Sequence, residues 1–141
     1  LGAILGWSSV ADILQPGMHG TTFGGNPVAC AAGVAVLEEL GERALMQHAA
    51  EMGTVLFSLL RDCVTDFPGL CKEVRGLGLM IGLELTGEAE PIVVAMRERG
   101  ILINGTDKSV LRFVPPLIVT ADEIHWTIRV LREVLSAFSS F

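Results

Sequence analysis

Residues 19–27 read His-Gly-Thr-Thr-Phe-Gly-Gly-Asn-Pro and stand directly before an apolar, alanine-rich run over residues 28–40. Asn26 has the side chain of a good helix N-cap, and Pro27 suits the first helical turn, where a missing N–H costs little. The pattern predicts a helix from Pro27 to about residue 40, entered from a glycine loop. Backbone N–H groups and hydroxyls at a helix N-terminus form a natural anion site, usually for phosphate. The alternative, a helix start that binds nothing, is the commoner case on local chemistry alone.

The bulk composition limits what the chain can be. It has 141 residues, which fits one ordinary domain, and 50% of them are hydrophobic, with a mean hydropathy of +0.54. No run reaches the roughly 18 apolar residues that span a bilayer, and no signal peptide is evident, so we expect no membrane partner. The excess of apolar residues is expected to lie against another domain or subunit. The net charge is −6 and the basic residues are scattered, which argues against nucleic-acid binding.

The cysteines and histidines point to neither a disulfide scaffold nor a metal centre. The three cysteines, Cys30, Cys63 and Cys71, form no CxxC pair, which indicates reduced thiols in a cytoplasmic protein. The three histidines are far apart and lack ligand spacing, so we expect no metal site.

Hydrophobic periodicity and turn residues predict the order of the remaining elements. Thr120 and Glu123 have the spacing of a capping box before the last helix. Besides the first helix, helices are expected over residues 9–14, 42–64, 90–99 and 121–138, strands over residues 1–5, 71–74, 79–85, 101–103 and 110–114, and turns over residues 75–78 and 104–107. This order predicts an α/β or α+β fold. The glycines of residues 76–82 do not make a dinucleotide fingerprint, because a strand follows them where that motif requires a helix.

The string at residues 19–27, with the Ala-Cys-Ala-Ala that follows it, resembles the phosphate-contacting loop of the class III aminotransferases. These are fold-type-I enzymes that use pyridoxal 5′-phosphate (PLP). The Arg-Gly-Leu-Gly-Leu of residues 75–79 and the Arg-Phe-Val-Pro-Pro-Leu of residues 112–117 are similar to further motifs of that family. The resemblance covers essentially the whole chain, but only the C-terminal portion of the family. It implies that residues 1–41 are the tail of the PLP-binding large domain, and residues 42–141 the C-terminal small domain with its linking helix.

The resemblance also implies roles for three side chains. Thr22 is expected to contact the PLP phosphate of the neighbouring subunit and Thr21 to lie beside the substrate, both across a homodimer interface. Arg112 is expected to bind the substrate carboxylate, since a guanidinium offers a planar, bidentate fork. The alternatives are that both hydroxyls only satisfy loop backbone, and that Arg112 is an edge-strand residue paired with Glu84 or a terminal carboxylate.

PLP chemistry requires a lysine that holds the cofactor as a Schiff base and moves the proton. The chain's lysines are Lys72 and Lys108. Neither matches the family's lysine, which ends a strand just before a glycine-rich turn and a Pro-x-Gly-Ala segment. Leu1-Gly2-Ala3 is similar to the tail of that segment, so we expect the lysine upstream of Leu1 and the isolated chain to be inactive.

Within the family, the chain most resembles enzymes that exchange an amino group between N2-acetylornithine and 2-oxoglutarate, a step of arginine biosynthesis in the cytoplasm. Ornithine, succinylornithine and 4-aminobutyrate remain alternative donors, because the arginine that reads the second carboxylate is expected upstream. A non-catalytic fragment that serves in dimerisation or binding is a second alternative. A small phosphate- or nucleotide-binding domain is a third, weakened because the chain contains no GxxxxGK[ST].

Overall fold

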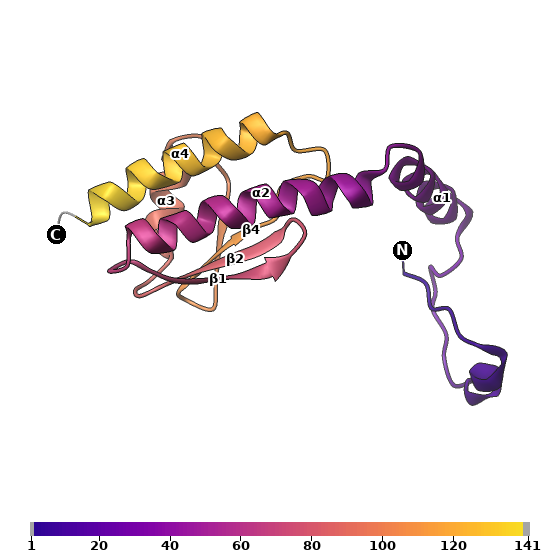
Figure 1. Cartoon of the computed structure of the whole chain (residues 1–141). Coiled ribbons are helices and arrows are strands. Elements are labelled where there is room, and N and C mark those ends of the chain that lie inside the picture. The colour runs from indigo at the N-terminus through magenta and orange to yellow at the C-terminus, as the bar shows by residue number, and fades with distance from the viewer. Residues whose placement is uncertain (1, 140–141) are drawn as a thin grey trace. The chain divides into compact units, whose positions relative to one another are not determined.

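The computed structural model describes residues 2–139 and divides into two compact units, Leu1–Arg43 and Ala44–Phe141. Helices and strands are mixed along the chain, as the sequence predicts (Figure 1). In order, the elements are a 3₁₀ helix η1 (Ser8–Ile13), α1 (Pro27–Glu42), α2 (Leu45–Asp66), β1 (Cys71–Leu77), β2 (Met80–Leu85), α3 (Glu90–Glu98), β3 (Asn104–Thr106), β4 (Val110–Phe113) and α4 (Ala121–Phe138). None of the helices in the described part of the chain combines the length and the apolar character that a bilayer crossing needs.

In the first unit, α1 begins at the predicted residue. Asn26 Oδ1 accepts a hydrogen bond from the backbone N–H of Ala29 at 2.9 Å, and Pro27 takes the first helical position. The predicted N-cap is therefore confirmed. The helix was predicted to end at about residue 40, but it continues through Gly41 to Glu42. A glycine costs only about 1 kcal/mol in a helix interior, so the surrounding helix formers outweigh it.

The segment ahead of the glycine loop differs from its prediction. Residues 2–5, predicted as a strand, form no regular structure, and Leu1 lies outside the described residues. A strand needs a neighbour to pair its backbone groups, and the described part of this unit has no other strand. The short helix predicted over residues 9–14 is present as η1, which begins at Ser8 with Trp7 as its N-cap and has no side-chain cap.

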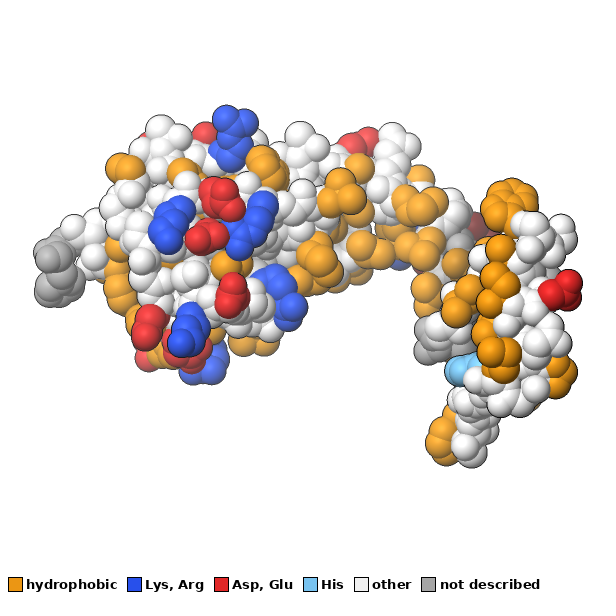
Figure 2. All heavy atoms as spheres, turned by 90° about the horizontal axis from the view of Figure 1, so that it is seen from below, with side chains coloured by type: hydrophobic (Ala, Val, Ile, Leu, Met, Phe, Trp, Pro, Cys, Tyr) orange, Lys and Arg blue, Asp and Glu red, His pale blue; other side chains and the backbone are white. Residues whose placement is uncertain are grey.

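The residues of described burial in the first unit form no buried core. Among its residues of described burial, none is buried. Trp7 and Phe23 expose 86% and 80% of their surface, and apolar side chains are bare over this unit (Figure 2). Such a surface is typical of a segment that packs against other protein.

The second unit is built on an antiparallel sheet of four strands in the order β1-β2-β4-β3. Alternate side chains of β2 and β4 point to one face and join the core with residues of α2, α3 and α4. In Figure 1, α2 lies along the sheet with α4 beside it, and the two helices contact each other. The buried strand residues of this core include Ile81, Leu83, Leu85, Leu111 and Phe113. The opposite face, which we call the open face, carries Arg75, Gly82 and Arg112 and is covered by no helix within the described residues of this unit.

Two turns lie at residues other than those predicted. β1 continues through Gly76, so the turn predicted over residues 75–78 is instead formed by Gly78 and Leu79, with Gly78 at a φ of 55°. The strand predicted over residues 101–103 is irregular, and β3 consists of the residues predicted as the next turn.

The β3–β4 hairpin itself is confirmed, but it turns at Asp107 and Lys108. Their φ values of 49° and 60° are positive, and together with Ser109 they form the three-residue connection between the paired Thr106 and Val110. This turn makes Asn104 a strand residue directly opposite Arg112.

Local contacts fix the helices around this sheet. The predicted capping box of α4 is confirmed, since Thr120 Oγ1 accepts from the Glu123 N–H and Glu123 Oε2 accepts from the Thr120 N–H. His48 Nε2 of α2 donates to the Val119 carbonyl at 2.8 Å, which ties α2 to the segment between β4 and α4.

Candidate functional site

The glycine loop forms a compact entry to α1. Asn26 Nδ2 donates to the Phe23 carbonyl at 2.7 Å, so the amide holds the loop with one end and caps the helix with the other. Gly25 has a φ of 70°, a conformation that favours glycine. A Cβ at Gly24 would overlap the methyl group of Thr21, so this side chain lies directly over the glycine.

The hydroxyls of Thr21 and Thr22 are exposed, and neither has a hydrogen-bond partner within residues 2–139. No hydrogen bond from either hydroxyl to the loop backbone is therefore present among the described residues, as the alternative interpretation would require. Two free hydroxyl donors beside a helix N-terminus suit a phosphate group, whose oxygens accept hydrogen bonds and favour the positive end of the helix dipole. The loop thus fits the phosphate end of PLP.

Arg112 lies on β4, between β2 and β3, and its exposed side chain is on the open face. β4 is an interior strand and Glu84 makes its ion pairs with other residues, so the edge-strand alternative with a Glu84 partner is wrong. Arg112 Nε donates to Asn104 Oδ1 at 3.4 Å. Within the described residues, the two terminal Nη atoms of Arg112 have no hydrogen-bond or ion-pair partner.

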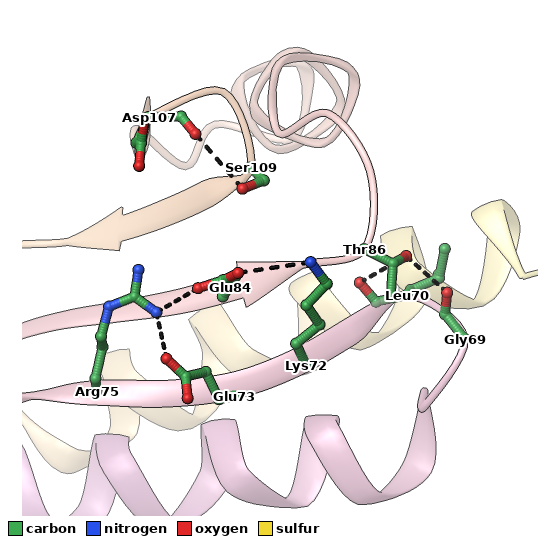
Figure 3. Close-up of polar contacts among 9 residues, drawn as sticks. All are labelled: Gly69, Leu70, Lys72, Glu73, Arg75, Glu84, Thr86, Asp107 and Ser109. Atoms are coloured by element: carbon green, nitrogen blue, oxygen red, sulfur yellow. Dashed lines mark hydrogen bonds and ion pairs between the residues drawn. The ribbon is translucent and has the colours of Figure 1, made fainter.

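Glu84 belongs to a separate charge network on the same face (Figure 3). Arg75 Nη1 lies 2.5 Å from both Glu73 Oε1 and Glu84 Oε2, and Lys72 Nζ lies 3.6 Å from Glu84 Oε1. The hydrogen bond from Arg75 holds the pKa of the Glu84 carboxyl below its usual value, and the charges of Arg75 and Lys72 act in the same direction. Figure 2 shows basic and acidic side chains intermingled on this unit. Glu84 makes its ion pairs with Arg75 and Lys72 and none with Arg112.

A shallow hollow lies on the open face between these two arginines. Its volume is about 610 Å³, and Gly82 forms part of its floor. Gly82 pairs with Arg75 on one side and with Arg112 on the other, so a residue without a side chain separates the two guanidinium groups. The hollow can take a small anion against Arg112.

Both lysines are exposed residues of the second unit. Lys72 is on β1, paired with Glu84, and Lys108 is an exposed residue of the β3–β4 turn. Both belong to the second unit, whereas Thr21 and Thr22 belong to the first. The residues present therefore fit a phosphate, at the glycine loop of the first unit, and a carboxylate, at Arg112 of the second.

Two of the three cysteines offer no nucleophile. Cys63 and Cys71 are buried in the core of the second unit, and burial raises the pKa of Cys71 to about 12. Their thiols remain protonated at neutral pH and act as packing groups.

Asn104 is the site residue that the sequence analysis missed. Its Asn-Gly dipeptide indicates a turn, and the residue gains its position beside Arg112 only through the hairpin register. The available signal was Asp107, which lies three positions after Asn104 and is a residue type common in turns.

Comparison with known proteins gives a consistent result over almost the whole chain. Residues 1–135 match the family model described as Aminotransferase class-III. The chain is 43% identical over 136 residues to an acetylornithine aminotransferase of Methanothermobacter thermautotrophicus, covering 96% of this chain and 35% of that protein. It is 36% identical over 135 residues to an ornithine aminotransferase of Brevibacillus brevis, covering 96% of this chain and 33% of the relative.

A solved structure supports the same relationship. The crystal structure of an acetylornithine aminotransferase from Elizabethkingia anophelis aligns with a TM-score of 0.82 and 28% sequence identity, covering 89% of this chain and 32% of that one. The chain thus spans about a third of the length of the proteins that it matches.

Proposed function

Because this chain belongs to the class III aminotransferases, we propose that it forms the C-terminal part of a PLP-dependent transaminase. Enzymes of this class depend on PLP, and the predicted fold, the C-terminal portion of a fold-type-I transferase, is confirmed by the solved relatives. We propose that residues 1–41 are the tail of the PLP-binding large domain and residues 42–141 the small domain with its linking helix.

PLP, when bound, supplies the electron sink through which an amino group moves between an amino acid and a keto acid. The role we propose for Thr22 is to donate its hydroxyl to the cofactor phosphate of the neighbouring subunit in a homodimer. Thr21, next to it in the loop, would contact the substrate. Both proposals are supported by hydroxyls that are exposed and have no partner in the described residues.

Arg112 provides the observation that carries the proposed function. Its Nη fork is unpaired among the described residues and borders a hollow on an interior strand of the sheet. A carboxylate bound there by two parallel, charge-assisted hydrogen bonds is held in one orientation. Holding the carboxylate orients the carbon that bears the amino group, which is how a binding residue can assist amino-group transfer.

The proton transfer in this reaction requires a lysine other than Lys72 and Lys108. Lys72 is held near Glu84, and Lys108 extends from a hairpin turn. We therefore propose that the chain alone is inactive, and that the lysine is supplied by the remaining part of the protein, upstream of Leu1.

The substrates that we propose are N2-acetylornithine and 2-oxoglutarate, which would place the protein in arginine biosynthesis in the cytoplasm. Relatives named as acetylornithine aminotransferases are 40–44% identical to the chain and those named as ornithine aminotransferases 36–42%, so identity alone does not separate these two donors. Ornithine, succinylornithine and 4-aminobutyrate are the competing donors.

A donor panel on the whole protein tests this proposal. Purified enzyme with PLP is assayed with each of the four donors and 2-oxoglutarate, and kcat/KM is compared. We expect the highest value with N2-acetylornithine. A higher value with another donor would replace the substrate, and no transfer with any donor would favour the non-catalytic binding module.

A further inference from the structure

We propose that Asn104 is a positioning residue that fixes the orientation in which Arg112 presents its guanidinium to a carboxylate. This inference rests on the proposed role of Arg112 as the carboxylate-binding residue. It states which edge of the Arg112 guanidinium remains available to a carboxylate, and that Asn104 keeps that edge available.

The sheet register places four residues in one row across the open face. Asn104 on β3 pairs with Arg112 on β4, Arg112 pairs with Gly82 on β2, and Gly82 pairs with Arg75 on β1. Directly opposite residues in an antiparallel pair lie about 5 Å apart, so Asn104 and Gly82 are the immediate lateral neighbours of Arg112. The side chain of Arg112 therefore has an amide on one side and no side chain on the other.

The contact with Asn104 uses one nitrogen of the guanidinium. Arg112 Nε donates to Asn104 Oδ1 at 3.4 Å. A guanidinium can bind a carboxylate side-on through Nε and one Nη, or end-on through both Nη atoms. Because Asn104 takes the Nε–H, the end-on fork is the edge left for the ligand.

The rest of the row leaves that fork free. Arg75 is engaged by Glu73 and Glu84, and neither carboxylate forms an ion pair with Arg112. Gly82 adds no side chain to the hollow beside the fork; a Cβ there would come within 3.0 Å of Val110 Cγ1. A neutral amide at position 104 also matters, because it accepts the Nε–H without cancelling the charge that attracts the ligand.

The test uses the whole protein loaded with PLP and measures binding rather than turnover. The ligands are a carboxylic-acid analogue of the donor that lacks its α-amino group, and the primary amide of the same molecule. The amide cannot form the charge-assisted pair, so the ratio of the two dissociation constants reports on the carboxylate contact alone. Calorimetric titration gives both constants.

Asn104→Leu removes the acceptor while keeping a similar size, and Asn104→Ala repeats the test without the added apolar bulk. In both, we expect affinity for the acid to fall about fivefold, the scale of one hydrogen bond, with amide affinity unchanged. Glu133→Gln is the control, because Glu133 is exposed on α4, does not line the hollow, and has no hydrogen-bond or ion-pair partner among the described residues. It should change neither constant.

Arg112→Gln separates failure of this inference from failure of the proposed function. If Arg112→Gln abolishes the preference for the acid but both Asn104 variants retain it, Asn104 does not position Arg112 and the inference is overturned. Equal losses for acid and amide in the Asn104 variants would also overturn it, because they indicate a general structural role. If Arg112→Gln keeps the preference, the proposed function itself is wrong at this residue.

Discussion

Arg75 Nη1 lies 2.5 Å from Glu84 Oε2, and this ion pair joins β1 to β2 on the open face of the sheet. The ion pair affects the proposed carboxylate site through Glu84 and not through direct contact with Arg112. Glu84 is the carboxylate that the sequence analysis considered as a partner for Arg112. Because Glu84 pairs with Arg75 instead, Arg112 is available for a ligand.

The Arg75–Glu84 pair predicts a pH-dependent contribution to stability. The folded-state pKa of Glu84 is lower than its ordinary value of 4.5, first through the hydrogen bond from Arg75. A group with a lowered folded-state pKa stabilises the fold above its unfolded-state pKa, and that stabilisation is lost as the pH falls through the folded-state pKa. Glu84→Gln should lower the melting temperature at pH 7, and the difference from the unsubstituted protein should shrink as the pH falls below 4.5.

Glu133→Gln serves as the control, since Glu133 is exposed on α4 and has no hydrogen-bond or ion-pair partner within the described residues. Its melting temperature should follow the unsubstituted protein at every pH. If the difference in melting temperature between Glu84→Gln and the unsubstituted protein stays constant down to pH 3, the ionised Glu84 carboxylate does not contribute to stability.

Replacing Gly53 by alanine should change the stability of the fold in the direction opposite to the one that helix propensity predicts. A Cβ at this position of α2 would overlap the backbone of Gly78 in the β1–β2 turn. Gly53→Ala should therefore destabilise the fold by about 1–3 kcal/mol through overpacking, although alanine is the better helix former. Chemical unfolding measures the change.

The matched substitution is Gly41→Ala on α1, where nothing lies within 4 Å of the added Cβ. It should be neutral or stabilise by up to about 1 kcal/mol. Equal effects of the two alanines would mean that α2 and the hairpin turn are not in close contact.

The capping box of α4 predicts a local contribution to stability. Thr120→Ala removes the hydroxyl that accepts from the Glu123 N–H and should cost about 1 kcal/mol in the free energy of unfolding. Thr54→Ala, an exposed position inside α2 whose hydroxyl donates to the Ala50 carbonyl, is the control and should not destabilise. A loss at Thr54 as large as that at Thr120 would remove the capping explanation.

Elements that depend on local chemistry could be predicted from the sequence. Asn26 and Thr120 cap their helices through contacts three residues away, so the side chains and their spacing are sufficient information. The long helices have apolar spacing over several turns, which makes their presence easy to predict and leaves only their ends uncertain.

Elements that depend on strand pairing lie at residues other than those predicted from the sequence. Asn104-Gly105 has the better turn composition, but the chain turns at Asp107-Lys108, because pairing with β4 uses Asn104 as a strand residue. Gly76 likewise remains in β1, paired with Ile81. Contacts between distant residues, such as Arg112 with Asn104, follow from this register and carry no signal in local sequence.

The glycine loop predicts a difference between its two threonines. In the whole protein, Thr22→Val should weaken PLP binding about tenfold, because it removes a hydrogen bond to a charged phosphate. Thr21→Val should leave PLP affinity nearly unchanged and raise the KM of the amino donor. Titration with PLP, followed by absorbance, and steady-state kinetics measure the two effects. A loss of PLP affinity confined to Thr21→Val would reverse the proposed assignment.

The most direct test of the proposed function is the KM of the amino donor in Arg112→Gln, measured in the whole protein beside Arg129→Gln, an exposed α4 arginine without a partner in the described residues. Loss of a bidentate, charge-assisted pair should raise that KM at least about tenfold in Arg112→Gln while PLP affinity is retained. Arg129→Gln should behave as the unsubstituted enzyme. An unchanged KM in Arg112→Gln would contradict the carboxylate-binding role on which the account depends.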